Sequence, residues 1–378
     1  MKFITLDQFI EIFATSNKLG FQDFLKKAQV KTPKQLIPLE RYMDDHNIPN
    51  QSIKLLFENI VNRNEYLQRF YEKSLRVLEP ITISDKAMPI SAMNNDAHVN
   101  YKNLIRNMFY KEILQTTQSG MENNPSFLNV LADLYLHNII DYKILTPSGM
   151  YYTKEGRLGS VFSSYYFRAS IMNPMIPYSL NHKVLKGSKI FTPTLGWGSY
   201  CYGFMECPYV SEYVGTDVIP QVCRKTAQFA NDYYPSKKCT IFCEPSENLM
   251  KIPGFSNKYK NYFDAVFFSP PYYELELYPG KNQSTTQYKT YEEWLEKYWV
   301  KTIQLCHHVL KSGGKMCYIL SGYGSHNTKG AYDLLKDMNT ISQNIFRGST
   351  MRKIPMYNKN VHVTSHRETA EKIMIFVK

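Results

Sequence analysis

The sequence predicts an α/β fold: a doubly wound sheet in the second half of the chain, preceded by a helical domain. From about residue 185, short apolar runs rich in β-branched and aromatic residues alternate with longer segments of helical periodicity. Such alternation favours a sheet of mainly parallel strands with helices on both faces. The first half instead carries apolar side chains three and four positions apart. We therefore expect a helical N-terminal domain over residues 1–150 and a sheet domain over residues 151–378.

The first half contains helical segments interrupted by stretches that carry Pro, Asn and Asp. The segments are LDQFIEIFA, GFQDFLKKA, SIKLLFENIVNRNEYLQRFYEKSLRVL and VNYKNLIRNMFYKEIL. A nucleic-acid clamp, a protein-binding module and a packing support all fit this half. The sequence does not choose between them.

The second half contains six short runs that read as strands. They are KIFTPTL, EYVGTDV, CTIFCEP, DAVFFSPP, KMCYIL and, at the very end, EKIMIFVK. The segments VCRKTAQFANDYY and TYEEWLEKYWVKTIQLCHHVLKSGG read as helices between them. We expect the second of these helices to stop at its terminal Gly pair.

The chain is basic, with a formal net charge of +12. A basic surface attracts polyanions without selecting a sequence. The charge is spread along the chain rather than gathered in a tail, so it is compatible with a nucleic-acid-binding face. Aromatic residues reach 14%, with 30 Tyr and 21 Phe. Compositional drift toward Tyr, Asn, Lys and Ile is the simpler explanation for that surplus.

The sequence gives no sign of export, membrane insertion or metal binding. It has no apolar run of about 18 residues, and MKFITLDQFIEIF has two acidic residues and no cleavage site of a signal peptide. Cys239 and Cys243 are the closest pair of the seven cysteines, but no second pair or nearby His completes a zinc set. His307 and His308 lie on a predicted helix. We expect no metal and reduced thiols in an intracellular protein, whether cytoplasmic, nuclear or virion-associated.

Four loops with glycine or polar residues follow the first four predicted strands. In order they contain Gly196-Trp197-Gly198, Asp217-Val218, Glu244-Pro245-Ser246 and Ser269-Pro270-Pro271-Tyr272. Ligands of open α/β sheets bind at the carboxyl ends of the strands, so the loops are candidates for one shared site.

Each of the first three loops also has a plain alternative. Paired glycines let a backbone approach a ligand closely, but they also suit an ordinary strand–helix turn. Asp217 can accept hydrogen bonds from ribose hydroxyls or cap a helix. Glu244 and Ser246 can contact an adenine edge or cap the next helix.

The fourth loop leaves very few backbone donors after a strand. Pro270 and Pro271 have no N–H, so they end the strand and leave carbonyl groups pointing outward beside Tyr272. A rigid turn of bare acceptors next to an aromatic ring suits a flat group that carries an amine. A structural Pro-Pro turn is the alternative.

The order and residues of these loops resemble the S-adenosylmethionine-dependent amino-methyltransferases of DNA, which methylate adenine N6 or cytosine N4. Their catalytic motif is Asp, Asn or Ser followed by Pro-Pro and an aromatic residue, and SPPY stands at 269–272. FTPTLGWGSYCYGF resembles the D-P-x-x-G-W-G cofactor loop of a phage and prokaryotic subset, and YVGTD resembles the ribose-binding strand end. YYELELYPGKNQSTTQYKTYEEWLEKYW resembles the segment that follows the motif in that subset. The resemblance covers roughly residues 160–378.

The resemblance implies a Rossmann-like methyltransferase sheet and a role for each residue of SPPY. The Ser269 hydroxyl and the Pro270 carbonyl would accept hydrogen bonds from the exocyclic amine and hold its lone pair toward the methyl group. Tyr272 would stack on a base flipped out of the duplex, which is worth ~1–3 kcal/mol. Pro271 would keep the turn rigid. Positioning, rather than strong base chemistry, would supply most of the rate.

The resemblance also implies a set of residues that bind S-adenosylmethionine. They are Phe167, Thr192, Gly196, Trp197, Gly198, Asp217, Val218, Glu244 and Ser246. Phe167 belongs to YYFRASIMNPMIP, which stands where the family has its last cofactor motif moved ahead of the first. Thr192 is a departure, because the family usually has an acidic residue there that places the amino end of the cofactor. Either the site tolerates the change, or the fold serves binding or scaffolding; the intact Asp217 favours the first.

The partner that the resemblance implies is nucleic acid, most of all double-stranded DNA. SPPY occurs more often with cytosine N4 than with adenine N6, and the target base stays open. Residues 281–289 and 347–360 mix basic, hydroxyl and amide groups with Tyr, as phosphate-contacting loops do, although solvated loops have the same composition. Glu274 and Glu276 suit the mouth of a pocket or a plain extended segment. Residues 1–150 offer a surface for a protein partner.

Two further classes of function stay open at this point. One is a methyltransferase of the same fold that acts on RNA or on a protein amine. The other is an inactive nucleic-acid-binding or structural protein, for which Thr192 is the sequence hint. That protein would bind polyanions in a salt-dependent way and would not bind the cofactor.

Overall fold

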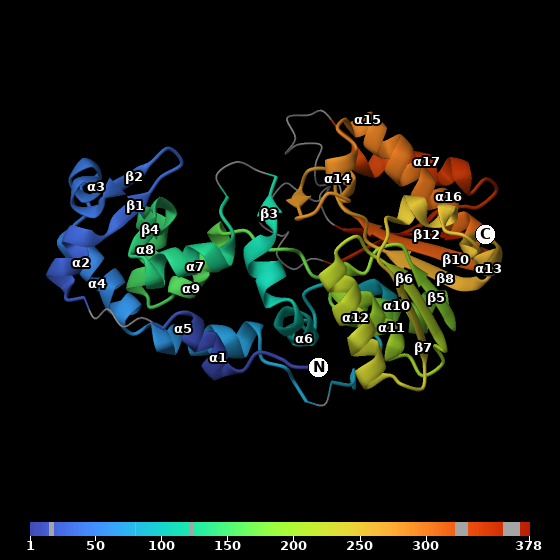
Figure 1. Ribbon diagram of the computed structural model, residues 1–378, viewed down its shortest axis with the longest axis horizontal. Helices are drawn as coiled ribbons and strands as arrows, with labels where there is room; N and C mark the ends of the chain where they lie inside the picture. Colours follow the sequence, from blue (N-terminus) through green and yellow to red (C-terminus); the bar gives the residue numbers. More distant parts are fainter. Residues whose placement is uncertain (15–18, 80, 121–123, 322–331, 358–370) are drawn as a thin grey trace. The chain divides into compact units, whose positions relative to one another are not determined.

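The chain forms two compact units (Figure 1). The computed structural model describes residues 1–14, 19–79, 81–120, 124–321, 332–357 and 371–378. The sheet unit consists of Met1, Leu78–Ile105 and Ile171–Lys378, and the helical unit consists of Lys2–Val77 and Arg106–Ser170. Both units draw on segments far apart in the sequence, whereas the sequence predicted a single boundary at residue 150. The division into domains of residues 1–150 and 151–378 stays a prediction.

The helical unit has the predicted helices and, in addition, a small sheet. Its helices are α1 (Leu6–Ile12), α2 (Phe21–Lys27), α3 (Leu39–His46), α4 (Asn50–Val61), α5 (Arg63–Ser74), η2 (Glu112–Thr116), α7 (Phe127–Leu136), η3 (Tyr142–Leu145), α8 (Pro147–Lys154) and α9 (Leu158–Tyr165). The chain passes between the units within α6 (Tyr101–Met108). β1 (Gln29–Lys31) pairs with β2 (Leu36–Pro38) antiparallel and with β4 (Ile139–Asp141) parallel. The sequence did not predict these strands, because each has only three residues.

Aromatic side chains form the core of the helical unit. The rings of Phe9 and Phe70 lie 5.6 Å apart, those of Phe70 and Phe127 5.1 Å, and those of Phe127 and Phe162 5.9 Å. These rings come from α1, α5, α7 and α9 and tie the helices to one another. Part of the aromatic surplus of the chain therefore has a packing role.

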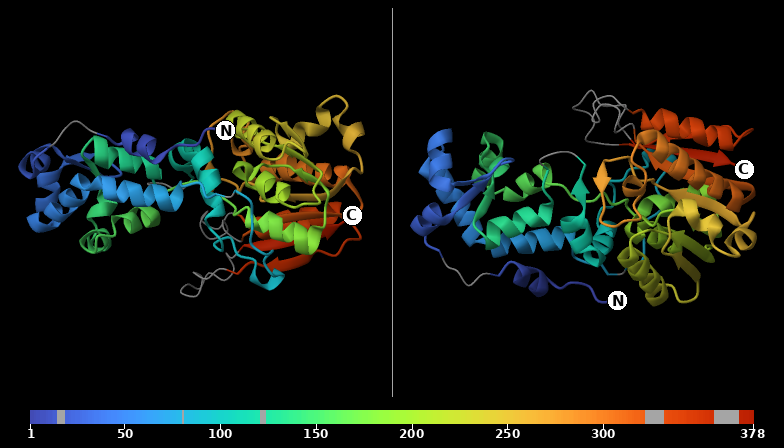
Figure 2. Two further views of the ribbon diagram at one scale, coloured as in Figure 1. Left: turned by 90° about the horizontal axis from the view of Figure 1, so that it is seen from below. Right: turned by 45° about the horizontal axis from the view of Figure 1, so that its top comes forward.

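The sheet unit is built on a seven-stranded sheet in the order β11-β12-β10-β8-β5-β6-β7. The strands are β5 (Lys189–Thr192), β6 (Glu212–Thr216), β7 (Lys238–Phe242), β8 (Phe263–Phe268), β10 (Leu310–Leu320), β11 (Arg352–Pro355) and β12 (Lys372–Val377). β12 runs antiparallel to both of its neighbours, β10 and β11, whereas the other neighbouring strands of the sheet pair in parallel. Figure 2 shows this C-terminal strand within the sheet. Its residues 373–376 are all buried, as in a strand covered on both faces.

The winding of the sheet confirms the predicted doubly wound, Rossmann-like fold. The first strand of the sheet, β5, lies in the middle; the chain continues through β6 and β7 on one side and through β8 and β10 on the other. The winding reverses between β5 and β8, and such a switch point is where open α/β sheets bind ligands. The sheet has one group of helices on each face (Figure 1). The first group is α10 (Met175–Leu180), α11 (Ser199–Met205) and α12 (Pro220–Tyr233), and the second is α13 (Phe255–Tyr259), α16 (Lys301–Val309) and α17 (Leu334–Ile345).

Shorter helices complete the sheet unit. They are η1 (Ile90–Ala92), η4 (Asn181–Leu185), η5 (Gly196–Gly198), η6 (Ser246–Lys251), α14 (Ser284–Gln287), α15 (Tyr291–Trp294) and η7 (Leu295–Val300). α15, η7 and α16 follow one another directly, where the sequence predicted one long helix. That helix ends at Val309 rather than at the Gly pair, because β10 already begins at Leu310 and Gly313 takes φ 73° within it. In the described residues, no helix combines the length and apolarity that a membrane crossing needs.

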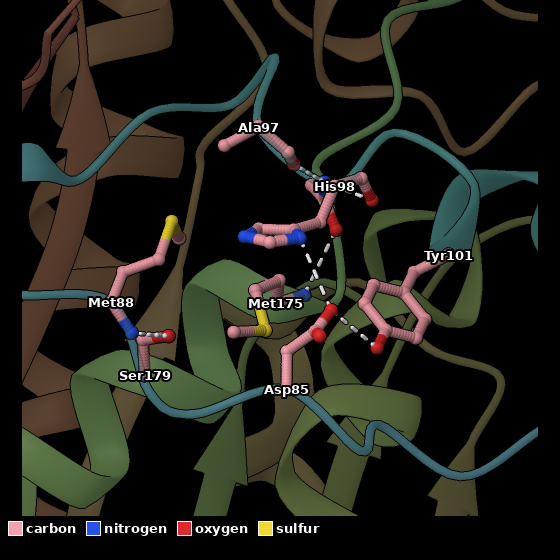
Figure 3. A network of polar contacts seen from close by, with 8 residues as sticks. Asp85, Met88, Ala97, His98, Tyr101, Met175 and Ser179 are labelled. Carbon is pink, nitrogen blue, oxygen red and sulfur yellow. Dashed lines mark hydrogen bonds and ion pairs between the residues drawn. The ribbon is translucent and has the colours of Figure 1, made fainter.

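Leu78–Ile105, the first long segment of the sheet unit, is hydrogen-bonded to α10. The N–H of Met88 donates to the hydroxyl of Ser179 at 2.9 Å. Figure 3 shows Asp85 between two partners: Oδ2 accepts from the Tyr101 hydroxyl at 2.8 Å and lies 3.1 Å from Nδ1 of His98. These bonds give the segment a fixed path over the sheet unit.

Candidate functional site

The structure brings three of the predicted loops together at the carboxyl ends of β5, β6 and β8. The N–H of Leu195, beside the predicted cofactor loop, donates to Asp217 Oδ2 at 3.2 Å. The N–H of Ser269 donates to the hydroxyl of Tyr200, in the helix that follows that loop, at 3.1 Å. Asp217 and Ser269 therefore hold the same loop from two strands, at the switch point of the sheet. We call these strand ends, with that of β7, the carboxyl edge.

The loop Gly196-Trp197-Gly198 has three consecutive left-handed residues, with φ of 51°, 59° and 78°. Trp197 is the unusual member, because a non-glycine side chain in this region costs roughly 1–2 kcal/mol. The hydroxyl of Ser199 donates to the Gly196 carbonyl at 2.6 Å, and the Gly198 N–H donates to the Leu195 carbonyl at 2.9 Å. Strained backbone that is held this firmly is typical of functional loops.

Replacing Gly196 by alanine is expected to destabilise the protein more than the matched change Gly254→Ala. A Cβ on Gly196 would lie 2.3 Å from Cζ of Tyr200, whereas a Cβ on Gly254, with φ 79°, meets nothing within 4 Å in the described residues. In both variants an alanine has to adopt a left-handed conformation, which destabilises the folded state. Only Gly196→Ala adds overpacking, which costs about 1–3 kcal/mol of stability. Thermal unfolding of the two variants measures the difference. Equal shifts would contradict the packing of Tyr200 beneath the loop.

Asp217 lies directly after β6, and its carboxylate accepts three backbone hydrogen bonds. Oδ1 accepts from Val218 at 2.8 Å and from Ile219 at 3.1 Å, and Oδ2 accepts from Leu195 at 3.2 Å. The first two bonds, to Val218 and Ile219, lie directly before α12, as expected if Asp217 caps that helix. A carboxylate has about four acceptor positions, so Oδ2 keeps one for a ligand. Burial raises the pKa of Asp217, and the three backbone donors act in the opposite direction.

The SPPY loop presents two neighbouring acceptors. The Ser269 hydroxyl donates to the carbonyl of Ile319, in β10, at 3.1 Å, so its one proton is committed and its lone pairs remain as acceptors. Pro270 is buried, and its carbonyl accepts no hydrogen bond from the described residues. Two acceptors in succession, with no donor between them, can hold both hydrogens of one amine.

Of the two tyrosines in this loop, Tyr272 is the partly exposed one, whereas Tyr273 is only 3% exposed. The Tyr272 hydroxyl accepts from the N–H of Ser321 at 2.9 Å, which fixes the ring between the ends of β8 and β10. Burial of the phenol raises the pKa of Tyr272, so it stays neutral. The Tyr273 hydroxyl donates to the carbonyl of Lys289 at 3.2 Å.

Tyr200 is a residue of the site that the sequence did not reveal. Its buried ring lies against Gly196 and meets Phe267 edge-on, with ring centroids 5.1 Å apart. Its hydroxyl binds the backbone of Ser269, which is 69 positions away. Tyr200 therefore couples the predicted cofactor loop to the predicted catalytic loop. No local motif signals such a contact.

Thr192 lies at the end of β5 but does not project as a free polar group. It is fully buried, and its hydroxyl lies 2.6 Å from that of Tyr213 in β6. The two hydroxyls satisfy each other inside the sheet unit. Its predicted contact with the cofactor stays a prediction.

The loop after β7 uses its predicted residues for structure. The side chain of Glu244 is exposed, and its backbone carbonyl accepts the hydroxyl of Thr216. Ser246 is buried, with its hydroxyl 2.8 Å from that of Thr302, and so holds η6 against α16. Contacts of Glu244 and Ser246 with a cofactor stay predictions.

Glu247 is the partly buried carboxylate of this loop, and the sequence did not single it out. It accepts the hydroxyl of Tyr288 at 3.2 Å, and burial raises the pKa of Glu247. Tyr278 meets Trp197 edge-on, with ring centroids 5.6 Å apart. The segment between these two tyrosines therefore reaches both the loop after β5 and the loop after β7. Just before this segment lies β9 (Glu276–Leu277), and the Glu276 carboxylate accepts the Tyr278 hydroxyl.

Phe167 lies in the helical unit. Its N–H donates to the Pro125 carbonyl at 3.0 Å, and its carbonyl accepts from Phe127 at 2.8 Å. Its predicted contact with the cofactor stays a prediction. Asn173, from the same sequence segment, belongs to the sheet unit and donates from its amide to the His98 carbonyl at 3.0 Å.

The second predicted DNA-contact segment is only partly a loop. Residues 352–355 form the edge strand β11, paired with β12, so the loop prediction is wrong there. Ile354 is buried and Lys353 exposed, which is the alternation of a strand with one covered face. Residues 358–360 lie outside the described residues. The first predicted segment, 281–289, contains α14. Contact of either segment with DNA stays a prediction.

The described residues contain no group of three or more His, Cys, Asp and Glu side chains placed to hold a metal ion. All seven cysteines are free thiols. Five of them are buried: Cys201, Cys207, Cys223, Cys306 and Cys317.

No protein-family model and no curated protein sequence matches the chain. Among solved structures, the chain is similar to fibrillarin from Aeropyrum pernix with bound S-adenosyl-L-methionine, at 10% identity over 50% of this chain and 66% of that chain, with a TM-score of 0.33. The N-methyltransferase NodS from Bradyrhizobium japonicum, in complex with S-adenosyl-L-homocysteine, is 12% identical over 54% of this chain and 83% of that chain, with a TM-score of 0.36. A putative rRNA methylase from Clostridium thermocellum is 13% identical over 52% and 94%, with a TM-score of 0.35. At these identities the likeness concerns the fold alone.

Proposed function

We propose that the sheet unit is an S-adenosylmethionine-dependent methyltransferase that acts on an exocyclic amine of a DNA base, cytosine N4 or adenine N6. The observation that carries the proposal is the pair of unused acceptors at Ser269 and Pro270 beside the partly exposed ring of Tyr272. Two acceptors and an aromatic ring match a flat base with an amine.

The residues at the carboxyl edge fit a nucleoside cofactor. Asp217 keeps an acceptor position for a ribose hydroxyl, and Val218 beside it is partly exposed. Gly196 and Gly198 both take positive φ, which glycine adopts without steric cost, and so they allow the tight turn of this loop at the carboxyl edge. We propose these residues, with Trp197, as the cofactor site.

S-adenosylmethionine, when bound, supplies an electrophilic methyl group on a positively charged sulfur. The Ser269 oxygen and the Pro270 carbonyl accept the two hydrogens of the amine and turn its lone pair toward that methyl group. Tyr272 stacks on the base and fixes its plane. The positioned nitrogen would take the methyl group that the cofactor supplies, the sulfur would keep the bonding electrons, and one proton of the amine would pass to water. Ser269 and Pro270 act by positioning, which raises the rate without strong base chemistry.

A second candidate is an inactive protein of the same fold. The observation that favours it is Thr192, whose hydroxyl is buried against Tyr213 and adds no charge to the site. A methyltransferase that acts on RNA is a third candidate, because the amine-binding geometry alone does not distinguish DNA from RNA.

We propose double-stranded DNA as the partner, on the basis of the net charge of +12, and a protein partner for residues 1–150. The odd number of cysteines fits reduced thiols, and we propose an intracellular setting, with a virus or mobile element as one such setting.

The experiment that tests this function uses S-adenosylmethionine labelled in its methyl group. The wild type and Ser269→Ala are each incubated with double-stranded DNA, single-stranded DNA and RNA, and the label in the nucleic acid is counted. We expect label in DNA with the wild type and strongly reduced label with Ser269→Ala. Label in RNA alone would replace DNA by RNA as the substrate. No label, together with no cofactor binding by calorimetry, would favour the inactive protein.

Cofactor binding is expected to weaken on acidification at a pH above the ordinary carboxyl pKa of 3.8. Burial raises the pKa of Asp217, so its carboxylate takes up a proton sooner than an exposed one as the pH falls. Binding is therefore complete above the raised pKa and is lost as the pH falls through it. Calorimetry from neutral to mildly acidic pH measures the effect. Asp217→Asn is the control, since its weaker binding should no longer change with pH.

A further inference from the structure

Tyr298, in η7, is a buried tyrosine whose hydroxyl the fold leaves unused. The residue is 3% exposed, and its hydroxyl has no hydrogen-bond partner among the described residues. A buried hydroxyl without a partner destabilises the folded state, because it loses its bonds to water. Such groups are rare in native proteins and call for an explanation.

The position of Tyr298 places it at the carboxyl edge. Thr302 lies one helical turn further along the same helical run, and its hydroxyl is 2.8 Å from that of Ser246 in η6. Side chains one turn apart share a helix face, so Tyr298 lies on the face that packs against the loop after β7. Its ring packs against Trp294, with ring centroids 5.0 Å apart, and so has a fixed orientation.

Burial raises the pKa of Tyr298, and Glu247, Cys306, Tyr200 and Asp217 raise it further. Three of these four residues belong to the carboxyl edge, since Glu247 follows β7, Tyr200 follows β5 and Asp217 follows β6. The two carboxylates, when ionised, only accept hydrogen bonds, whereas a phenol can donate. A bound nucleoside has acceptors as well as donors, in its ring nitrogens and its hydroxyls. Tyr298 therefore offers the donor that the carboxylates lack.

We propose that the Tyr298 hydroxyl is a cofactor-binding group that donates a hydrogen bond to the nucleoside part of S-adenosylmethionine. This inference rests on the proposed function, because it takes the carboxyl edge as the cofactor site. The unused hydroxyl then has its partner in the bound state. In the free protein the Tyr298 hydroxyl lacks a hydrogen-bond partner among the described residues, and the bound ligand would provide one.

Tyr259, in α13, provides a matched control. It is 1% exposed, and its hydroxyl likewise has no partner within the described residues. Its ring stacks on Phe263, the first residue of β8, with ring centroids 5.3 Å apart. Tyr259 therefore has the same unsatisfied hydroxyl, but its ring packs between the start of β8 and Phe242 at the end of β7 (ring centroids 6.4 Å apart) and does not belong to the helical run that carries Thr302.

The test compares Tyr298→Phe and Tyr259→Phe in the full chain. Thermal unfolding without ligand should show both variants at least as stable as the wild type, because each loses an unsatisfied hydroxyl. Calorimetry with S-adenosylmethionine, S-adenosylhomocysteine and 5′-methylthioadenosine should show Tyr298→Phe binding all three about tenfold more weakly, the value of one hydrogen bond. Tyr259→Phe should bind them like the wild type. Equal losses for all three ligands place the contact on the nucleoside, since methylthioadenosine has no amino-acid part.

The outcomes separate this inference from the proposed function. Unchanged affinity of Tyr298→Phe, with binding by the wild type, would overturn the inference and leave the proposed function intact. Equal losses in both Phe variants would also overturn it, because the effect would then not depend on the carboxyl edge. If the wild type binds none of the three ligands, the proposed function and this inference fail together.

Discussion

Replacing Ser269 by alanine is expected to lower the rate of methyl transfer by roughly 100-fold, the usual loss when one positioned hydrogen-bonding group at a reacting centre is removed. The change removes one of the two acceptors that hold the amine. It leaves the backbone N–H of residue 269 bound to Tyr200, so the loop keeps its place. Affinity for S-adenosylmethionine should not change. Single-turnover kinetics measures the first effect and calorimetry the second.

Ser342→Ala is the matched control for this prediction. Its hydroxyl donates to the backbone carbonyl of Met338 within α17 at 2.9 Å, as that of Ser269 donates to the carbonyl of Ile319, although Ser342 is fully buried and Ser269 is partly exposed. Loss of the Ser342 hydroxyl should leave the rate of transfer unchanged. Full activity of Ser269→Ala, or an equal loss in Ser342→Ala, would contradict the role given to Ser269.

Replacing Asp217 by alanine is expected to weaken the binding of S-adenosylmethionine by roughly 100-fold. One lost hydrogen bond to a charged acceptor costs about 1.5–3 kcal/mol, which is about a 10- to 100-fold loss. The variant also frees the N–H of Leu195, which the carboxylate holds beside Gly196, so the cofactor loop loses part of its support. The expected loss therefore lies at the upper end of this range. Calorimetry with the purified variant gives the affinity directly.

Asp264→Ala separates binding from general stability. The Asp264 carboxylate also accepts two backbone hydrogen bonds, from Ser188 at 2.9 Å and Lys189 at 2.8 Å, but it does so at the start of β5. Both variants should lose stability, and only Asp217→Ala should lose cofactor affinity. If both bind the cofactor as tightly as the wild type, the ribose role of Asp217 is wrong.

The sheet was predictable because its signals are local. Each of the six predicted runs coincides with a strand of the sheet. The glycine, carboxylate and Pro-Pro loops follow the strands at short, readable spacings, and the rule that ligands bind at the carboxyl ends then gathers them in one place. The strand that was missed, β11, is short and lies at the edge.

The residues that complete the site were not predictable, because their roles depend on distant contacts. Tyr200 meets Ser269 across 69 positions, and Glu247 meets Tyr288 across 41. Tyr298 is one of four tyrosines whose buried hydroxyl lacks a partner in the described residues, and only its place in the fold connects it with the site. The chain has 30 tyrosines, and no local motif distinguishes Tyr200, Tyr288 or Tyr298 from the others. The interleaving of the two compact units is hidden for the same reason, since it depends on which segments pack together.

Thr192 shows how a departure from a motif can have a structural reason. The sequence presents it as a missing acidic residue. In the fold it is buried and shares a hydrogen bond with Tyr213, at 2.6 Å. A carboxylate in its place would be buried beside a phenol, which is costly without further donors. The hydrogen bond between Thr192 and Tyr213 instead gives both buried hydroxyls a partner without adding a charge.

Mass spectrometry of nucleosides tests the central claim most directly. Double-stranded DNA that contains all four bases is incubated with the wild type and S-adenosylmethionine, digested to nucleosides and analysed beside a Ser269→Ala reaction. We predict N4-methylcytosine or N6-methyladenine in the wild-type reaction and at most a trace with Ser269→Ala. DNA with neither nucleoside, after incubation with a protein that binds S-adenosylmethionine, would contradict the claim that a DNA base amine receives the methyl group.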